Sequence, residues 1–221
     1  MLVRAPEFDW AFRIGAGSKD VSRDITMDKS GNLIVTGYFT GTVDFDPGPN
    51  TMNLVSNLGT QDVFLQKLDA NGNLIWANHV GNSSSELGMS VRTDSLNNIY
   101  VLGQFRNTVD FDPGPGTFNL TAATNSSDVF MQKLDSNGNF IWAKKILTGS
   151  DIKTGFSFCI DNAGSIYTAG YFEGKVDFDP NGSFDMCIRF LTTRVFAPPY
   201  NGVVTPEIAI KYRNQENRSL L

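Results

Sequence analysis

A strict internal repeat governs this sequence and limits the folds that it can adopt. Trp10, Trp76 and Trp142 lie at equal intervals in the segments FDWAF, LIWAN and FIWAK. The segment DVFLQKLDANGN at residues 62–73 returns as DVFMQKLDSNGN at residues 128–139, shifted by the same interval. A period of tens of residues is typical of solenoids and propellers, in which each unit is one supersecondary structure. The chain is therefore an array of similar units, and the step from one tryptophan to the next is one repeat.

Each unit is predicted to form four short β-strands. In the first complete unit, the segments DITMD, LIVTGYF, DVFLQKL and LIWAN carry the β-branched and aromatic residues that favour strands. Between them stand DKSGN and DANGN, whose Asp, Asn and Gly residues suit tight hairpins with positive φ. No segment shows sustained helical periodicity. Four antiparallel strands per repeat predict an all-β fold made of β-propeller blades.

The units do not add up to a closed propeller, so we expect an incomplete one with two full blades. Propellers generally close with about four to eight blades, and an incomplete array leaves strand edges through which chains can associate. The expected divisions are the last strand of a preceding blade (1–15), two complete blades (16–80 and 81–146), a truncated third blade (147–190) and a divergent tail, frameshifted or disordered (191–221).

Charge and hydropathy exclude two classes of partner. The formal net charge is -5 and the isoelectric point is about 4.8, which leaves no basic surface to release counterions from nucleic acid. No stretch approaches the roughly 18 apolar residues of a membrane span. We therefore expect no binding of nucleic acid and no insertion into a membrane.

Reactive side chains are sparse. The single histidine, His79, follows the second tryptophan strand and is expected to be a solvated strand-end residue. The common signatures of hydrolases, metallopeptidases and nucleotide-binding proteins are absent. Cys159 aligns with polar positions of a first strand and Cys187 with apolar positions of a third strand, so both are expected to be passive residues. The sequence predicts no catalytic residue.

The turns DANGN and DSNGN imitate the opening of a calcium loop. In an EF-hand the sixth position would be Gly and the twelfth Glu. Here the sixth positions are Leu74 and Phe140, and the twelfth are Val80 and Ile146. We therefore interpret both turns as β-hairpins.

A pair of aspartates recurs in VDFDPGPN, VDFDPGPG and VDFDPNGS and is the main candidate site. Side chains two residues apart in an extended segment point to the same side, so the two carboxylates of each motif would repel each other unless their charge is neutralised. A calcium ion would neutralise it. The favoured alternative is structural: the phenylalanine between the aspartates staples a long loop to the blade, and the aspartates cap the turn that follows. The candidate ligands are Asp44, Asp46, Asp110, Asp112, Asp177 and Asp179.

These motifs also resemble a known family. The segment GYFTGTVDFDPG followed by DVFLQKLDANGNLIWA is similar to the bacterial β-propeller repeats called SBBP, over roughly residues 8–186. The resemblance implies a propeller fold and an extracellular or cell-surface setting, and it implies no reaction. Two functional hypotheses stay open: a non-enzymatic scaffold or surface for proteins or glycans, and a fragment of a carbohydrate-active enzyme whose catalytic residues lie in blades outside this chain.

Overall fold

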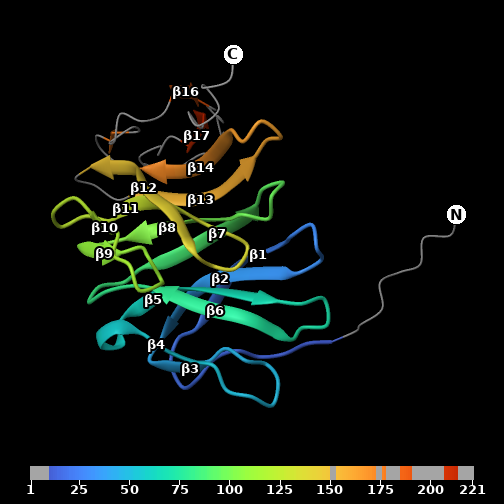
Figure 1. The fold of residues 1–221 in the computed structure, drawn as a ribbon. Coiled ribbons are helices and arrows are strands. Elements are labelled where there is room, and N and C mark those ends of the chain that lie inside the picture. Colours follow the sequence, from blue (N-terminus) through green and yellow to red (C-terminus); the bar gives the residue numbers. More distant parts are fainter. Residues whose placement is uncertain (1–9, 150–152, 173–175, 178–184, 191–206, 214–221) are drawn as a thin grey trace, which may run out of the picture.

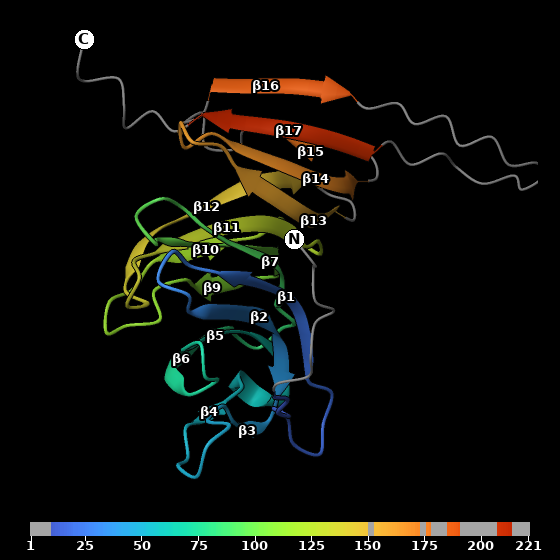
Figure 2. The same ribbon diagram turned by 90° about the vertical axis from the view of Figure 1, so that its right-hand side faces the viewer.

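The computed structural model consists of stacked antiparallel β-sheets (Figure 1). It describes residues 10–149, 153–172, 176–177, 185–190 and 207–213. Both views show the first, second and third sheets in chain order along the stack (Figures 1 and 2). The sheets are open and propeller-like, which confirms the predicted all-β fold of four-stranded units.

The first sheet has the strand order β1-β2-β5-β6, and every neighbouring pair is antiparallel. Both middle strands are buried along most of their length, as their nearly continuous apolar runs predict. The strands are β1 (Val21–Met27), β2 (Leu33–Thr40), β5 (Gln61–Leu68) and β6 (Leu74–Val80).

The second sheet repeats this order one repeat later and gains one short strand. Its order is β15-β12-β11-β8-β7, in which β15 comes from the third unit and pairs with the end of β12. The strands are β7 (Leu87–Thr93), β8 (Ile99–Phe105), β11 (Asp128–Leu134), β12 (Phe140–Gly149) and β15 (Val176–Asp177).

A two-stranded hairpin stands between the second and third strands of each complete unit. The sequence predicts only a long loop in both places. The hairpin strands are β3 (Thr42–Asp44) with β4 (Asn53–Val55), and β9 (Thr108–Asp110) with β10 (Asn119–Thr121). A 3-10 turn, η1 (Asn57–Gly59), follows the first hairpin.

The third sheet departs from the predicted strand order. The repeat predicts that FDMCIRF is its third strand, but β17 takes that position beside β14, and β16 lies at the edge. A segment of the divergent tail thus completes this sheet by backbone pairing, which needs no match to the repeat. The strands are β13 (Lys153–Ile160), β14 (Ile166–Phe172), β16 (Asp185–Phe190) and β17 (Glu207–Arg213).

Hydrophobic side chains fill the space between neighbouring sheets. One cluster joins aliphatic residues of the first sheet, including Ile34 and Val80, to Val91, Val101 and Phe130 of the second. A second cluster joins the second sheet to the third. Burying a Val, Ile or Phe side chain contributes about 1.5–3 kcal/mol, so stacking is the main source of stability between units.

The same type of tight turn, with the same hydrogen bonds, closes hairpins in all three units and confirms the hairpin prediction. In the first example Asp28 Oδ1 accepts the N–H groups of Ser30 and Asn32, each at 2.9 Å. The N–H of Gly31 donates to the carbonyl of Asp28 at 3.0 Å. The same bonds recur in the turns that begin at Asp69, Asp94, Asp135 and Asp161.

The fourth position of this turn needs a positive φ. Gly31 has a φ of 84° and no atom within 4 Å of the site of a Cβ, so Gly31→Ala should cost about 1–2 kcal/mol through backbone strain alone. Gly31→Asn should cost less, because Asn97 occupies the matching position with a φ of 62°. Urea unfolding of the three proteins would measure this order. An alanine variant as stable as the native chain would contradict it, and Gly17→Ala, at an unstrained open position, is the control.

Candidate functional site

The first aspartate pair bonds to its own loop. Asp44 Oδ1 accepts the N–H of Asp46 at 3.0 Å and that of Met52 at 2.8 Å. Asp46 Oδ1 accepts the N–H of Gly48 at 2.7 Å. The carboxylates therefore close the hairpin loop between β3 and β4 by capping backbone donors, as the structural interpretation predicts.

The second copy has the same geometry. Asp110 Oδ1 accepts the N–H groups of Asp112 at 3.0 Å and Phe118 at 2.7 Å, and Asp112 Oδ1 accepts that of Gly114 at 2.8 Å. In the third copy Asp177 ends β15, and Asp179 lies outside the described residues. Among the described side chains, no three His, Cys, Asp or Glu are grouped closely enough to hold a metal ion. Calcium binding by these pairs stays a prediction.

The phenylalanine between the aspartates anchors the loop. Phe45 is fully buried and contacts the rings of Phe39 and Phe64, with centroids 5.2 Å and 5.0 Å away. Its carbonyl accepts a hydrogen bond from Gln66 Nε2 at 2.6 Å. Phe111 repeats this arrangement with Gln132 in the second unit. The motif therefore fixes the hairpin to the sheet through both its side chain and its backbone.

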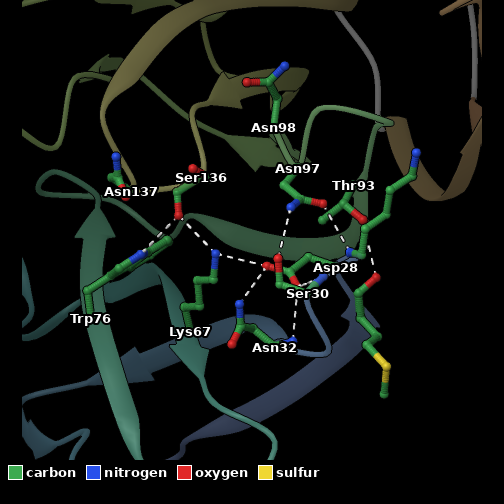
Figure 3. Close-up of polar contacts among 12 residues, drawn as sticks. Asp28, Ser30, Asn32, Lys67, Trp76, Thr93, Asn97, Asn98, Ser136 and Asn137 are labelled. Atoms are coloured by element: carbon green, nitrogen blue, oxygen red, sulfur yellow. Dashed lines mark hydrogen bonds and ion pairs between the residues drawn. The ribbon is translucent and has the colours of Figure 1, made fainter.

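A buried ion pair joins the turn of one unit to the next unit (Figure 3). Lys67 Nζ lies 2.9 Å from Asp28 Oδ2, and the exposed fractions of the two side chains are 6% and 1%. The same ammonium donates to the carbonyl of Ser136 in the second unit at 3.0 Å. Burial raises the pKa of Asp28, but hydrogen bonds from Asn32 and Lys67 outweigh it and hold the pKa below its ordinary value of 3.8.

The repeated tryptophan lies against the same turn of the following unit. Trp76 Nε1 donates to the carbonyl of Ser136 at 3.4 Å, and a Cβ on Gly138 would stand 3.3 Å from the indole ring. Trp10 has the same relation to Gly72, at 3.6 Å. The equal spacing of the tryptophans thus reflects one contact between units, used twice.

Replacing Lys67 by Met should lower the free energy of unfolding by about 3 kcal/mol, because the buried Asp28 carboxylate loses its counter-ion. Lys133→Met should lower the free energy of unfolding by less, because Lys133 Nζ lies farther from its carboxylate, 3.8 Å from Asp94 Oδ2. Chemical denaturation would measure both. The double variant with Lys67→Met and Asp28→Asn should lose less free energy of unfolding than the two single variants lose in sum. Strictly additive losses would contradict a stabilising ion pair.

A second buried carboxylate, Asp62, holds the start of β5. It is fully buried, and its Oδ2 accepts the N–H of Asn57 at 3.0 Å and contacts His79 Nδ1 at 3.1 Å. A Cβ at Gly81 would lie 2.1 Å from Asp62 Cγ, so only glycine fits there. His79 lies at the end of β6, as expected, but its side chain is only 29% exposed and pairs with Asp62.

Glu86 occupies the junction between the first and second units. Its Oε2 accepts the N–H of Asn82 at 2.9 Å, and its Oε1 accepts that of Arg106 at 3.5 Å. Burial raises the pKa of Glu86 to about 8 despite these bonds, and the nearby carboxylate of Asp62 adds to the shift. Asp20, one repeat earlier, bonds to the N–H groups of Ala16 and Thr40 in the same way.

The raised pKa of Glu86 makes stability depend on pH. Below about pH 4.5, its ordinary pKa, Glu86 is protonated in the folded and unfolded chain; between there and about pH 8 only the unfolded carboxyl ionises readily. This contribution to the free energy of unfolding is therefore complete at low pH and lost as the pH rises. Glu86→Gln should remove a decline in the free energy of unfolding on the order of 3 kcal/mol between pH 5 and pH 8.

Urea unfolding at intervals from pH 5 to 8 would test this prediction as the difference between the two proteins. A constant difference across that range would contradict it. Asp20→Asn, at the matching position of the first unit, serves as the control, because it alters a carboxylate that accepts the same two kinds of backbone hydrogen bond.

The spacing of the buried carboxylates along the sequence could have revealed their roles. Asp62 and Asp128 stand one repeat apart, as do Asp20 and Glu86, and in the structure the members of each pair accept equivalent hydrogen bonds.

Two further sequence-based expectations concern Cys159 and the membrane. Cys159 is an exposed free cysteine on β13. The described helical turn is far too short to cross a bilayer.

Comparison with known proteins agrees with this repeat architecture. An uncharacterized WD repeat-containing protein of Acanthamoeba polyphaga mimivirus is 31% identical over 174 residues. The chain is similar to a WD repeat protein. WD repeats form four-stranded propeller blades, which matches the sheets described above. The aligned region covers 74% of this chain but only 12% of the viral protein, and no protein-family model matches the chain.

Proposed function

We propose that this chain is a non-enzymatic propeller-repeat scaffold that presents a surface to proteins or glycans. The observation that carries the proposal is the repetition of its acidic side chains in structural roles. Asp44 and Asp110 close loops, Asp62 and Asp128 hold strand starts, and Asp28 pairs with Lys67, the lysine that bonds to the second unit. Catalytic groups normally break such symmetry, because one reaction needs one arrangement of side chains.

Two finer features belong to this proposal. We assign the repeats to the SBBP type on the motifs GYFTGTVDFDPG and DVFLQKLDANGNLIWA, and with that type comes an extracellular or cell-surface setting. The similarity to a WD repeat protein supports a repeat scaffold whose surface binds other molecules. The carbohydrate-active alternative depends on residues outside this chain, and no described side chain favours it.

A joint assay of binding and turnover tests the scaffold. The chain would be titrated calorimetrically with a panel of polysaccharides, and reducing ends would be followed in the same mixtures. We expect saturable, stoichiometric binding without the release of reducing ends. Turnover that Glu86→Gln abolishes and that Asp20→Asn leaves intact would overturn the proposal, because it would place catalysis in one blade only.

A further inference from the structure

Two asparagines that precede glycine lie in the same type of turn, one in each complete unit. Asn71 lies in the turn between β5 and β6, and Asn137 lies in the turn between β11 and β12. Two more Asn-Gly pairs, at residues 181–182 and 201–202, lie outside the described residues. We infer that Asn71 is a site of spontaneous deamidation in the folded chain, whereas contacts from the first unit protect Asn137. This inference does not depend on the scaffold function.

Deamidation at an Asn-Gly pair needs only water. The main-chain nitrogen of the glycine attacks Cγ of the asparagine, the bond between Cγ and Nδ2 breaks, and ammonia leaves with the proton of the glycine N–H. Water then opens the resulting cyclic imide at either carbonyl and gives aspartate or isoaspartate. Glycine favours the first step because it has no Cβ to hinder the approach of its nitrogen.

Both turns resist this reaction while they are closed. In each turn the glycine N–H donates to the carbonyl of the first aspartate, at 3.0 Å in the first unit and 3.1 Å in the second. The asparagine N–H donates to a carboxylate oxygen of the same aspartate, at 2.8 Å in both. Asn71 and Asn137 are exposed to water, but a nitrogen held in this way cannot attack. The reaction therefore proceeds from the opened turn, and its rate reports the free energy of local opening.

The first unit holds the second of these turns closed (Figure 3). The carbonyl of Ser136 accepts hydrogen bonds from Lys67 Nζ at 3.0 Å and from Trp76 Nε1 at 3.4 Å. The carbonyl of Gly138 accepts one from Asn78 Nδ2 at 3.4 Å. Hydrogen bonds from a charged donor such as lysine are among the stronger ones in proteins. Opening this turn breaks all three bonds as well as those within the turn.

The turn at Asn71 has no such support from the described residues. None of them outside the turn donates a hydrogen bond to the carbonyls of Ala70 and Gly72. Phe12 stands one repeat before Asn78, and its side chain has no donor. Trp10 lies against Gly72, so only the ring contact is repeated here. The Asn71 turn should therefore open more often than the Asn137 turn.

Deamidation would change the turn in two ways. An aspartate at position 71 places a second carboxylate beside Asp69, and like charges at this distance repel each other. An isoaspartate adds one methylene to the main chain, which alters the spacing between Asp69 and Gly72, whose φ is 83°. Either product should weaken the turn between β5 and β6.

The test compares the folded chain with the same chain in concentrated guanidinium chloride, both in mildly alkaline buffer. After digestion, mass spectrometry and chromatography would measure aspartate and isoaspartate at positions 71 and 137. The protection of each asparagine is its deamidation rate in denaturant divided by its rate in the folded chain. Both asparagines stand in the segment Asn-Gly-Asn, so their rates in denaturant should agree. Protection should be about tenfold greater at Asn137. Equal protection, or greater protection of Asn71, would overturn the inference.

A lysine variant identifies the protecting contact. Lys67 belongs to the hairpin of Asn71 but bonds to the turn of Asn137, so Lys67→Met should narrow the difference in protection between the two asparagines. Lys133→Met is the matched control, because Lys133 belongs to the hairpin of Asn137 and pairs with Asp94. It should leave the difference unchanged. A difference that narrows in the control and persists in Lys67→Met would overturn the role of the first unit.

Discussion

Ile34, Val63 and Val80 of the first sheet pack against the second sheet, and the other contacts between these units depend on this burial. Three side chains of this size contribute about 1.5–3 kcal/mol each, but aliphatic contacts alone do not fix how one sheet lies on another. Polar contacts supply that register. Asp24 Oδ2 accepts hydrogen bonds from Ser90 Oγ at 2.7 Å and from the N–H of Val91 at 2.9 Å.

The acidic composition of the chain follows from the same architecture. Each complete unit needs aspartates to begin its tight turns, to close its inserted hairpin and to start a buried strand. Hydrogen bonds to the ionised form keep the pKa of Asp69 and Asp135 low, because Asn73 and Asn139 donate to them. These aspartates accept hydrogen bonds from their own turns in each complete unit. Repetition of an acidic motif is therefore evidence of a structural role before it is evidence of a ligand.

Much of the fold could be predicted because its signals are local and repeated. The turns at Asp69 and Asp135, the four strands per unit and the anchoring role of Phe45 all follow from short segments that occur more than once. The pairing of His79 with Asp62 was missed because it joins two strands, although the next unit places Lys145 at the matching position, 4.0 Å from Asp128.

The raised pKa of Glu86 could not be predicted from the sequence either, because it results from burial between units and not from the residue type. The place of β17 could not be predicted for a related reason: backbone pairing with β14 and β16 requires no repeat motif. The short hairpins β3–β4 and β9–β10 are predicted only as loops because such short strands carry little periodicity. Tertiary contacts decided each of these features.

The central claim is that polar side chains join one unit to the next, and a double-mutant cycle between Asp24 and Ser90 tests it most directly. Urea unfolding of Asp24→Ala, Ser90→Ala and the double variant gives the coupling free energy across the junction. The account predicts a coupling of about 1.5–3 kcal/mol, as for a hydrogen bond to a charged group. A coupling of zero would contradict the account, because the hydrogen bond from Ser90 to Asp24 would then contribute nothing to the stability of the junction.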